Sequence, residues 1–239
     1  MTRDLSIQVF LMRRLRALAS GVLVVVALSG LAVSQRAANG AASVAVVTFT
    51  LDFPESDPTH YSIAVDAMGH ASYECTARVD KDSEEQAYRA EFEVSTRNRE
   101  RIFEWARQAK YFAGKVDSGN QKLAFTGEKM LSYQDGERSF TGRYNYSNLE
   151  PVRQLTGLFQ NMAGTLDYGR RLTYYHRYQK LALDEELKRM EAQARSNELS
   201  EIQGVAPVLR EIVEDTSVMN VVRARAKELI QMGNGAAGR

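Results

Sequence analysis

A short amphipathic segment, Thr96 to Phe112, separates two strand-rich parts of the chain, and this order constrains the fold more than any other feature. Its apolar residues recur at intervals of three and four, as in a helix with one buried face. The segment carries the only tryptophan, Trp105. A lone large aromatic residue at helical spacing usually packs against a core, although a ligand-stacking ring is the alternative. We therefore expect this helix to lie against a sheet made by the flanking strands.

Alternation of apolar and polar residues predicts strands on both sides of this helix. A helix that begins near Glu150 and carries an apolar stripe as far as Leu166 follows the last strand. A hairpin followed by a helix, twice, predicts an α+β fold with one antiparallel sheet built from two β-β-α-like units. The expected strands are 43–53, 61–66, 72–79 and 88–94 before the first helix, and 123–126, 129–133 and 138–146 after it.

From Gly169 onward, helical periodicity replaces strand alternation. We expect one long helix with apolar residues from Leu172 to Ala194, a second helix kinked by Pro207, and a third helix after it. The last two resemble a single HEAT-type helical hairpin. The sequence therefore predicts an α+β domain at 45–168, a helical extension at 169–232 and a disordered tail at 233–239.

Residues 1–34 have the composition of an export signal. Arginines at 13–16 precede an uncharged apolar run at 17–33, and small residues at 32–34 suit cleavage by signal peptidase. The apolar run is also just long enough to span a bilayer, so an uncleaved anchor is the alternative. We expect an exported, periplasmic or otherwise extracytoplasmic protein, with a flexible lead-in at 35–44 and membrane contact only through the N-terminal segment.

Charge and cysteine content restrict the class of protein. Without residues 1–34, the chain has 27 basic and 29 acidic side chains, a formal net charge of −2. This lacks the strong positive field that non-specific nucleic-acid binding requires. Cys75 is the only cysteine, which excludes a disulfide within the chain. Its position in phase with Tyr73 on a predicted strand favours a buried thiol over a nucleophile or an intermolecular bridge.

The sequence contains no recognisable catalytic or metal-binding motif. The three histidines lack metal-ligand spacing, and phosphate-loop, dinucleotide and nucleophile-elbow patterns are missing. We therefore expect no metal and no cofactor, and we favour a protein that is not an enzyme. Two alternatives stay open. One is an envelope-polymer hydrolase that uses carboxylates such as Asp66 and Glu74, and the other is a small-molecule carrier with an apolar cavity.

Aromatic and cationic side chains alternate between Tyr168 and Lys180. Tyrosine rings beside guanidinium groups suit glycans, anionic polymers or lipid headgroups. The alternative is that these tyrosines pack the helix against the sheet domain. The candidate binding residues are Tyr168, Arg170, Arg171, Tyr174, Arg177 and Tyr178.

Part of the chain resembles a family of bacterial exported domains of unknown function. The resemblance lies in the run from Pro58 to Asp66, the return strand from Gly69 to Glu74 and the helix that ends at Tyr111-Phe112, and it covers about residues 45–165. Those domains have a Pro-x-Tyr strand, an Asp-Gly turn and a Tyr-Glu return strand. This chain departs from the pattern by a longer spacing before Tyr61, two residues inserted in the turn and no cysteine before the proline. The resemblance implies an α+β fold and an envelope location, and it carries no known activity.

These observations predict an exported envelope protein that acts as a non-catalytic binding or interaction module. The partner we expect is an envelope protein, or an anionic polymer or glycan, and self-association is a further option.

Overall fold

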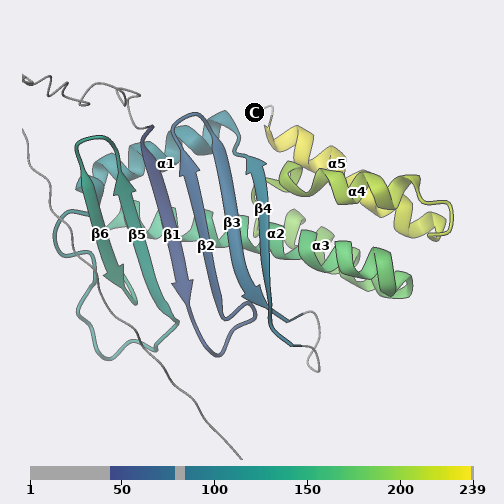
Figure 1. The fold of residues 1–239 in the computed structure, drawn as a ribbon, viewed down its shortest axis with the longest axis horizontal. Helices are drawn as coiled ribbons and strands as arrows, with labels where there is room; N and C mark the ends of the chain where they lie inside the picture. The colour runs from purple at the N-terminus through teal and green to yellow at the C-terminus, as the bar shows by residue number, and fades with distance from the viewer. Residues whose placement is uncertain (1–43, 79–83, 238–239) are drawn as a thin grey trace, which may run out of the picture. The chain divides into compact units, whose positions relative to one another are not determined.

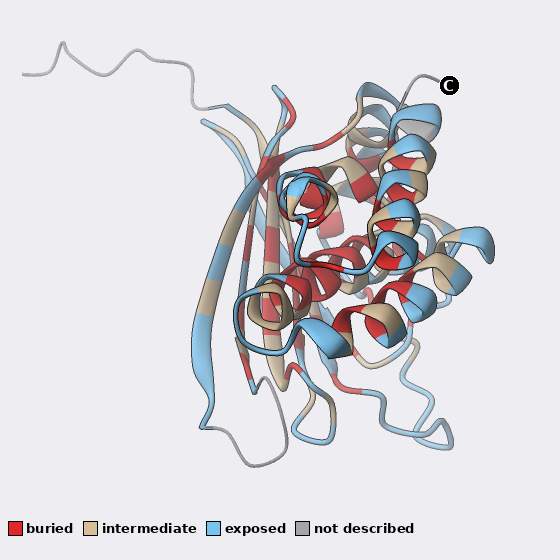
Figure 2. Cartoon of the chain, turned by 90° about the vertical axis from the view of Figure 1, so that its right-hand side faces the viewer, coloured by how far each residue is buried: buried red, intermediate tan, exposed pale blue. Residues whose placement is uncertain are grey.

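Six antiparallel strands form one sheet, and helices cover one of its two faces (Figures 1 and 2). The strand order is β4-β3-β2-β1-β5-β6, so β1 is central and β4 and β6 are the edges. A four-stranded meander precedes the first helix, and the β5–β6 hairpin then adds to the other side of β1. The strands are β1 Val46–Asp52, β2 His60–Asp66, β3 His70–Ala77, β4 Gln86–Glu93, β5 Glu128–Gln134 and β6 Ser139–Tyr144.

The predicted α+β fold is confirmed, with helices C-terminal to the sheet. Helices α1 and α2 lie behind the sheet in Figure 1, and α3, α4 and α5 lie beyond β4. We call α3 to α5, together with the short helices η2 and η3, the helical lobe. The helices are α1 Thr96–Gln108, η1 Lys110–Phe112, α2 Glu150–Tyr178, η2 Lys180–Ala182, α3 Leu183–Arg195, η3 Ile202–Val205, α4 Ala206–Glu214 and α5 Asn220–Ala237.

This computed structural model describes residues 44–78 and 84–237. The predicted export signal at 1–34 and the lead-in up to residue 43 lie outside the described residues. Among the helices that are described, none is both long and apolar enough to cross a membrane.

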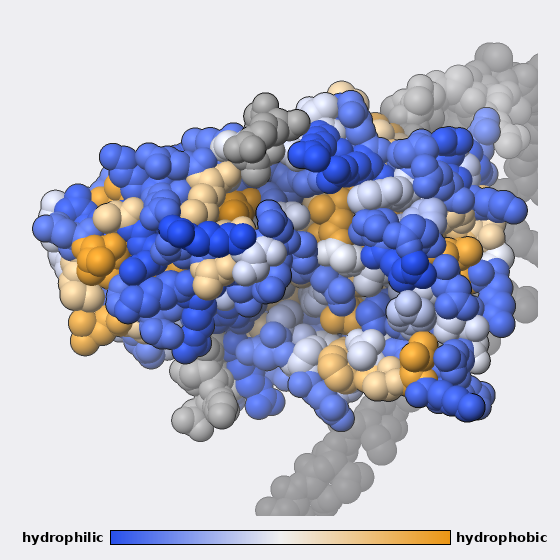
Figure 3. Space-filling view, turned by 180° about the vertical axis from the view of Figure 1, so that it is seen from behind, coloured by the Kyte–Doolittle hydropathy of each residue, from blue (hydrophilic) through white to orange (hydrophobic). Residues whose placement is uncertain are grey.

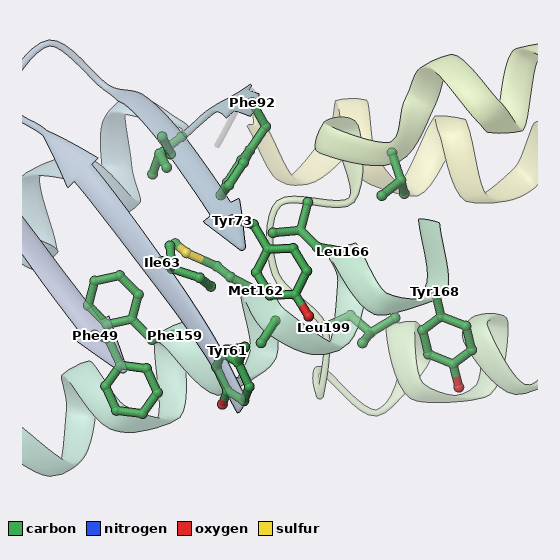
Figure 4. Close-up of a cluster of buried hydrophobic side chains, with 14 of the residues drawn as sticks. Phe49, Tyr61, Ile63, Tyr73, Phe92, Phe159, Met162, Leu166, Tyr168 and Leu199 are labelled. Atoms are coloured by element: carbon green, nitrogen blue, oxygen red, sulfur yellow. The ribbon is translucent and has the colours of Figure 1, made fainter. Parts of the chain in front are cut away.

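Aromatic side chains fill the space between the sheet and α2. Phe49 of β1 stacks on Phe159 of α2, with ring centroids 5.5 Å apart and planes at 6° (Figure 4). Helix α1 buries Ile102 and Ala106 against the same core. Trp105 is only partly buried and packs at the margin of that core, with the Arg101 guanidinium 6.0 Å from its ring. The smaller residues of the apolar stripe therefore anchor α1 more deeply than the tryptophan does.

The end of the first helix differs from the prediction. The α-helix stops at Gln108, and Lys110, Tyr111 and Phe112 form a left-handed turn with φ of 52°, 56° and 68°. Tertiary contacts hold this turn. The ring centroids of Tyr111 and Tyr133 lie 4.5 Å apart, and the guanidinium of Arg138 lies 4.3 Å from the centroid of the Tyr111 ring. Residues other than glycine rarely adopt this conformation, so helical spacing alone could not predict the turn.

Four other sequence predictions are corrected. Residues 123–126 form no strand. The predicted long helix is two helices, because Gln179 has non-helical φ and ψ of −144° and 59° and α3 begins only at Leu183. Pro207 lies in the first turn of α4 and causes no kink, since proline needs no intrahelical donor there. Helix α5 continues to Ala237, so the predicted disordered tail is helical up to that residue.

Helix α2 is continuous across residues 168 and 169, where the sequence suggested a domain boundary. Gly169 lies in close contact with the lobe, since a Cβ built on it would lie 2.5 Å from a methyl carbon of Val205. A second link is the Glu201 carboxylate, which accepts hydrogen bonds from the backbone N–H (3.0 Å) and hydroxyl (2.8 Å) of Ser95. Glu201 thus satisfies a free donor at the start of α1, which lacks a side-chain cap of its own. The described residues, 44–78 and 84–237, belong to one compact unit.

We predict that Gly169→Ala destabilises the protein by about 2 kcal/mol, because the added methyl group would separate α2 from η3. Gly157 is the matched control, since it lies in the same helix and a Cβ there meets nothing within 4 Å. We expect Gly157→Ala to stabilise the protein by about 0.5–1 kcal/mol through helix propensity. Urea unfolding measures both values. Equal effects of the two substitutions would contradict the close contact.

Candidate functional site

A pocket of about 190 Å³ opens between the first residues of β4 and the last turns of α2. We call it the β4–α2 pocket. Its sheet wall consists of Ala77 and residues 86–88, and its helix wall consists of Arg170, Thr173, Tyr174, Arg177 and Tyr178. The pocket has aromatic rings on both walls, because Tyr88 of β4 faces the tyrosines of α2. Its volume suits a single ring or side chain and is smaller than most sites for drug-sized ligands.

Four of the six predicted binding residues line this pocket, namely Arg170, Tyr174, Arg177 and Tyr178. Intervals of three and four place them on one face of α2. Tyr168 and Arg171 belong to the same helix but do not line the pocket. The prediction thus joined residues of α2 that have different surroundings.

Tyr168 and Arg171 connect α2 to α3. The Arg171 guanidinium lies 4.7 Å from the Tyr168 ring centroid, and its Nε donates to Glu186 of α3 at 2.5 Å. Tyr168 is 5% exposed, and burial together with the Glu186 charge raises its pKa to about 12. For these two residues, the packing interpretation describes the geometry better than ligand binding does.

Arg170 is buried at the floor of the pocket with its charge compensated. Its Nε donates to Asp167 Oδ1 at 2.9 Å, and Nη1 donates to the carbonyl of Arg78 at 2.8 Å. Its Nη2 lies 2.7 Å from the same Asp167 oxygen, an ion pair without the geometry of a hydrogen bond. Such a compensated guanidinium can shape the pocket but contributes little net charge to it.

Arg177 provides a positive charge that no described carboxylate compensates. It is exposed, and within residues 44–78 and 84–237 no carboxylate pairs with its side chain. Its guanidinium lies 5.9 Å from the centroid of the Tyr178 ring, which in turn lies 5.1 Å from the Tyr174 ring. Tyr178 is 64% exposed. An anionic group beside Arg177 and a flat or extended group across the two rings would both find partners here.

Asp215 at the end of α4 holds the end of α2 in position. Its carboxylate accepts from Lys180 Nζ at 2.6 Å, lies 3.0 Å from His176 Nε2, and accepts from Ser217 at 2.6 Å and 2.9 Å. The hydrogen bond from Lys180, followed by those from Ser217, holds the pKa of Asp215 well below its usual range. The last turn of α2, with Arg177 and Tyr178, is therefore fixed to the helical lobe.

Cys75 is buried on the inner side of β3, as the sequence predicted, and is 4% exposed. Burial raises the pKa of its thiol. The neighbouring Tyr73 hydroxyl is fully buried and makes no hydrogen bond of good geometry with described residues. A thiol of raised pKa in the core is unsuited to act as a nucleophile.

The carboxylates that the hydrolase alternative required have structural partners. Asp66 accepts from the backbone N–H of Met68 (2.8 Å) and of His70 (2.9 Å). Burial opposes its ionisation, but hydrogen bonds from His70 and Met68 outweigh that effect and lower the pKa of Asp66. Glu74 accepts from Arg89 at 2.8 Å. The lowered pKa of Asp66 is the opposite of the raised pKa typical of a general acid. Both lie on the uncovered sheet face, where Asp66 borders an open, acidic depression of about 560 Å³.

The described residues show no group of three or more histidine, cysteine, aspartate or glutamate side chains that could hold a metal ion. The surface that carries the helices is mainly hydrophilic, with apolar areas that are small and separate (Figure 3). A large apolar docking face is therefore not visible on this side.

No family model and no curated protein matches this chain. The resemblance of residues 45–165 to exported domains stays a prediction that rests on the residues quoted for it.

We predict that Asp215→Asn flattens the acid side of the stability profile. The pKa of Asp215 is lower in the folded state than in the unfolded state, where it is about 4. Ionised Asp215 therefore stabilises the folded protein at pH values above about 4, and this stabilisation is lost as the pH falls below that value. The wild-type protein should therefore lose more free energy of unfolding between about pH 5 and pH 2 than the variant loses. Urea titrations across that range test this, with Glu214→Gln as an exposed neighbour that keeps the wild-type slope. Parallel profiles for wild type and Asp215→Asn would contradict the assignment.

We predict that Cys75 reacts at least about ten-fold more slowly with an aromatic disulfide reagent at pH 8 in the native protein than in urea. Burial and the raised pKa both suppress the thiolate. Native and unfolded protein that react at the same rate would show that the thiol is accessible.

Proposed function

We propose that this protein is an exported, non-catalytic binding module of the cell envelope, and that its ligand site is the β4–α2 pocket. The observation that carries the proposal is the convergence of Arg177 with Tyr174, Tyr178 and Tyr88 around one concave site. An exposed guanidinium without a described partner favours an anionic ligand, and flanking tyrosine faces favour a ring or an extended group.

Catalysis is less well supported than binding. All the carboxylates whose pKa is displaced in the described residues have it lowered, which stabilises the ionised form and removes a candidate general acid. They are Asp66, Glu104, Asp117, Asp135, Glu150, Asp184 and Asp215. The apolar space between sheet and helices is occupied by side chains such as Phe49 and Phe159, which weakens the carrier alternative.

The test measures binding of two carboxylate polymers to the full chain by calorimetry. Polygalacturonate carries its carboxylates on sugar rings, and a peptide of alternating valine and glutamate carries them on a polypeptide. We expect at least one probe to bind, and Arg177→Glu to weaken that binding about ten-fold or more, because a charge-assisted contact becomes repulsive. Tyr178→Ala should weaken it by a smaller factor.

Arg97→Glu is the matched control. Arg97 is also exposed on a helix, α1, and forms no ion pair within the described residues. The Arg97→Glu substitution should leave the binding of both polymers unchanged, because α1 does not line the pocket. If neither probe binds the wild-type protein, or if Arg177→Glu and Arg97→Glu behave alike, the β4–α2 pocket is not an anion site and the proposal fails.

A further inference from the structure

The edge strand β4 has hydrogen-bonding groups that no described residue uses. The register pairs His70 with Glu93, and the N–H of Val94 donates to the carbonyl of Gly69 at 2.9 Å. In an antiparallel pair, successive residues point their backbone groups alternately toward and away from the partner strand. The backbone N–H and C=O groups of the even-numbered residues of β4 therefore form the hydrogen bonds to β3. Ala87, Arg89, Glu91 and Glu93 direct their N–H and C=O groups outward, and no backbone hydrogen bond among the described residues involves these groups.

The helical side of the molecule continues past this edge. Helices α3, α4 and α5 lie beyond β4 in Figure 1, and in Figure 2 the edge of β4 faces the viewer with the helices to its right. The end of α2 reaches the same place, since Tyr174, Arg177 and Tyr178 line the pocket against residues 86–88. A further strand beside β4 would lie about 4.8 Å from it, with one of its faces directed at α2. The edge strand and the helix thus form two sides of a single slot.

Pairing of β4 with a second copy of itself does not fit this geometry. Antiparallel pairing of identical strands requires a twofold axis perpendicular to the sheet, so both helix layers would lie on the same side. The helical lobe of each copy extends beyond its own β4 on that side (Figure 1) and would occupy the space behind the sheet of the other copy. The slot is therefore better suited to a narrow, extended segment than to a second sheet.

We propose that the free edge of β4 binds an extended segment of a partner protein, which adds a strand to the sheet and inserts an acidic side chain into the β4–α2 pocket beside Arg177. This inference rests on the proposed function, because it names the ligand of the same site. Backbone pairing along β4 provides affinity, and the pocket selects one side chain of the segment. Arg177 selects a carboxylate at the position that faces α2.

Amide hydrogen exchange with the valine–glutamate peptide tests the strand pairing directly. Alternation places all glutamates of the peptide on one face, so they can meet Arg177 while the valines face away. We expect the peptide to protect the outward amides of Ala87, Arg89, Glu91 and Glu93. The amides of Tyr88 and Ala90, already paired with β3, should not change. Polygalacturonate has no amide backbone and should not protect any of them.

Proline at position 91 provides the matched variant. Glu91→Pro removes one outward N–H at an edge position, where proline is tolerated, and Glu91→Ala removes the same side chain but keeps the N–H. Unfolding curves establish that both variants fold. We expect Glu91→Pro to weaken peptide binding about ten-fold relative to Glu91→Ala, because a strand hydrogen bond is lost and the ring blocks its replacement. Any polygalacturonate binding should be the same in both.

Each remaining outcome is decisive. If Glu91→Pro and Glu91→Ala bind the peptide equally and the outward amides stay unprotected, the added strand is wrong. Sensitivity to Arg177→Glu would then still support the pocket as an anion site. If Arg177→Glu weakens only polygalacturonate binding, the ligand is a glycan and the inference fails while the proposed function stands. If the free chain sediments as a dimer that Glu91→Pro dissociates, a second copy occupies the edge, and the partner segment is overturned.

Discussion

Helix α2 connects the sheet to the helical lobe, because its first half lies against the sheet and its second half extends beyond the edge strand. Phe159 on the first half stacks on β1, and Gly169 at the transition permits contact with η3. The buried charges of Asp167 and Arg170, with the partly buried Arg171, follow directly after the apolar core. Loss of one partner in such a buried network leaves an uncompensated charge, which is far more costly than loss of a surface ion pair. The network therefore fixes where α2 passes from core to pocket.

The arrangement of α2 also explains why two chemically similar arginines have different roles. Arg170 has a carboxylate and a carbonyl within hydrogen-bonding distance and is 7% exposed, so its charge is already compensated. Arg177, two turns later, lies where the helix has left the sheet. Asp215 contacts the nearby His176 and Lys180 and forms no ion pair with Arg177. A helix that crosses a sheet edge changes from buried to exposed along its length. The binding capacity of α2 is therefore confined to its last turns.

The two faces of the sheet carry different kinds of side chain. The inner face carries large side chains such as Phe49, Ile63 and Tyr73, whereas the centre of the outer face carries small hydroxyl side chains such as Thr48, Ser62 and Ser72. An antiparallel sheet can leave one face solvated, and its polar alternation is consistent with that. Charged residues on the outer side of β4 protect the edge against indiscriminate pairing, as edge strands commonly require. A selective partner must therefore supply more than backbone groups, and the pocket beside the edge offers that second contact.

The sequence by itself determined the order and type of nearly all elements, because strand alternation and helical spacing are local patterns that burial on one face imposes. It also identified the tyrosine–arginine stretch from Tyr168 to Lys180 and the burial of Cys75. Only the tertiary structure decided which of those tyrosines and arginines act together. The second wall of the pocket comes from residues 86–88, and the cap of α1 comes from Glu201, both far away in the chain. The same holds for the left-handed turn at Tyr111 and for the unbroken passage of α2 through Gly169. Those features depend on contacts between distant segments, for which local propensity carries no signal.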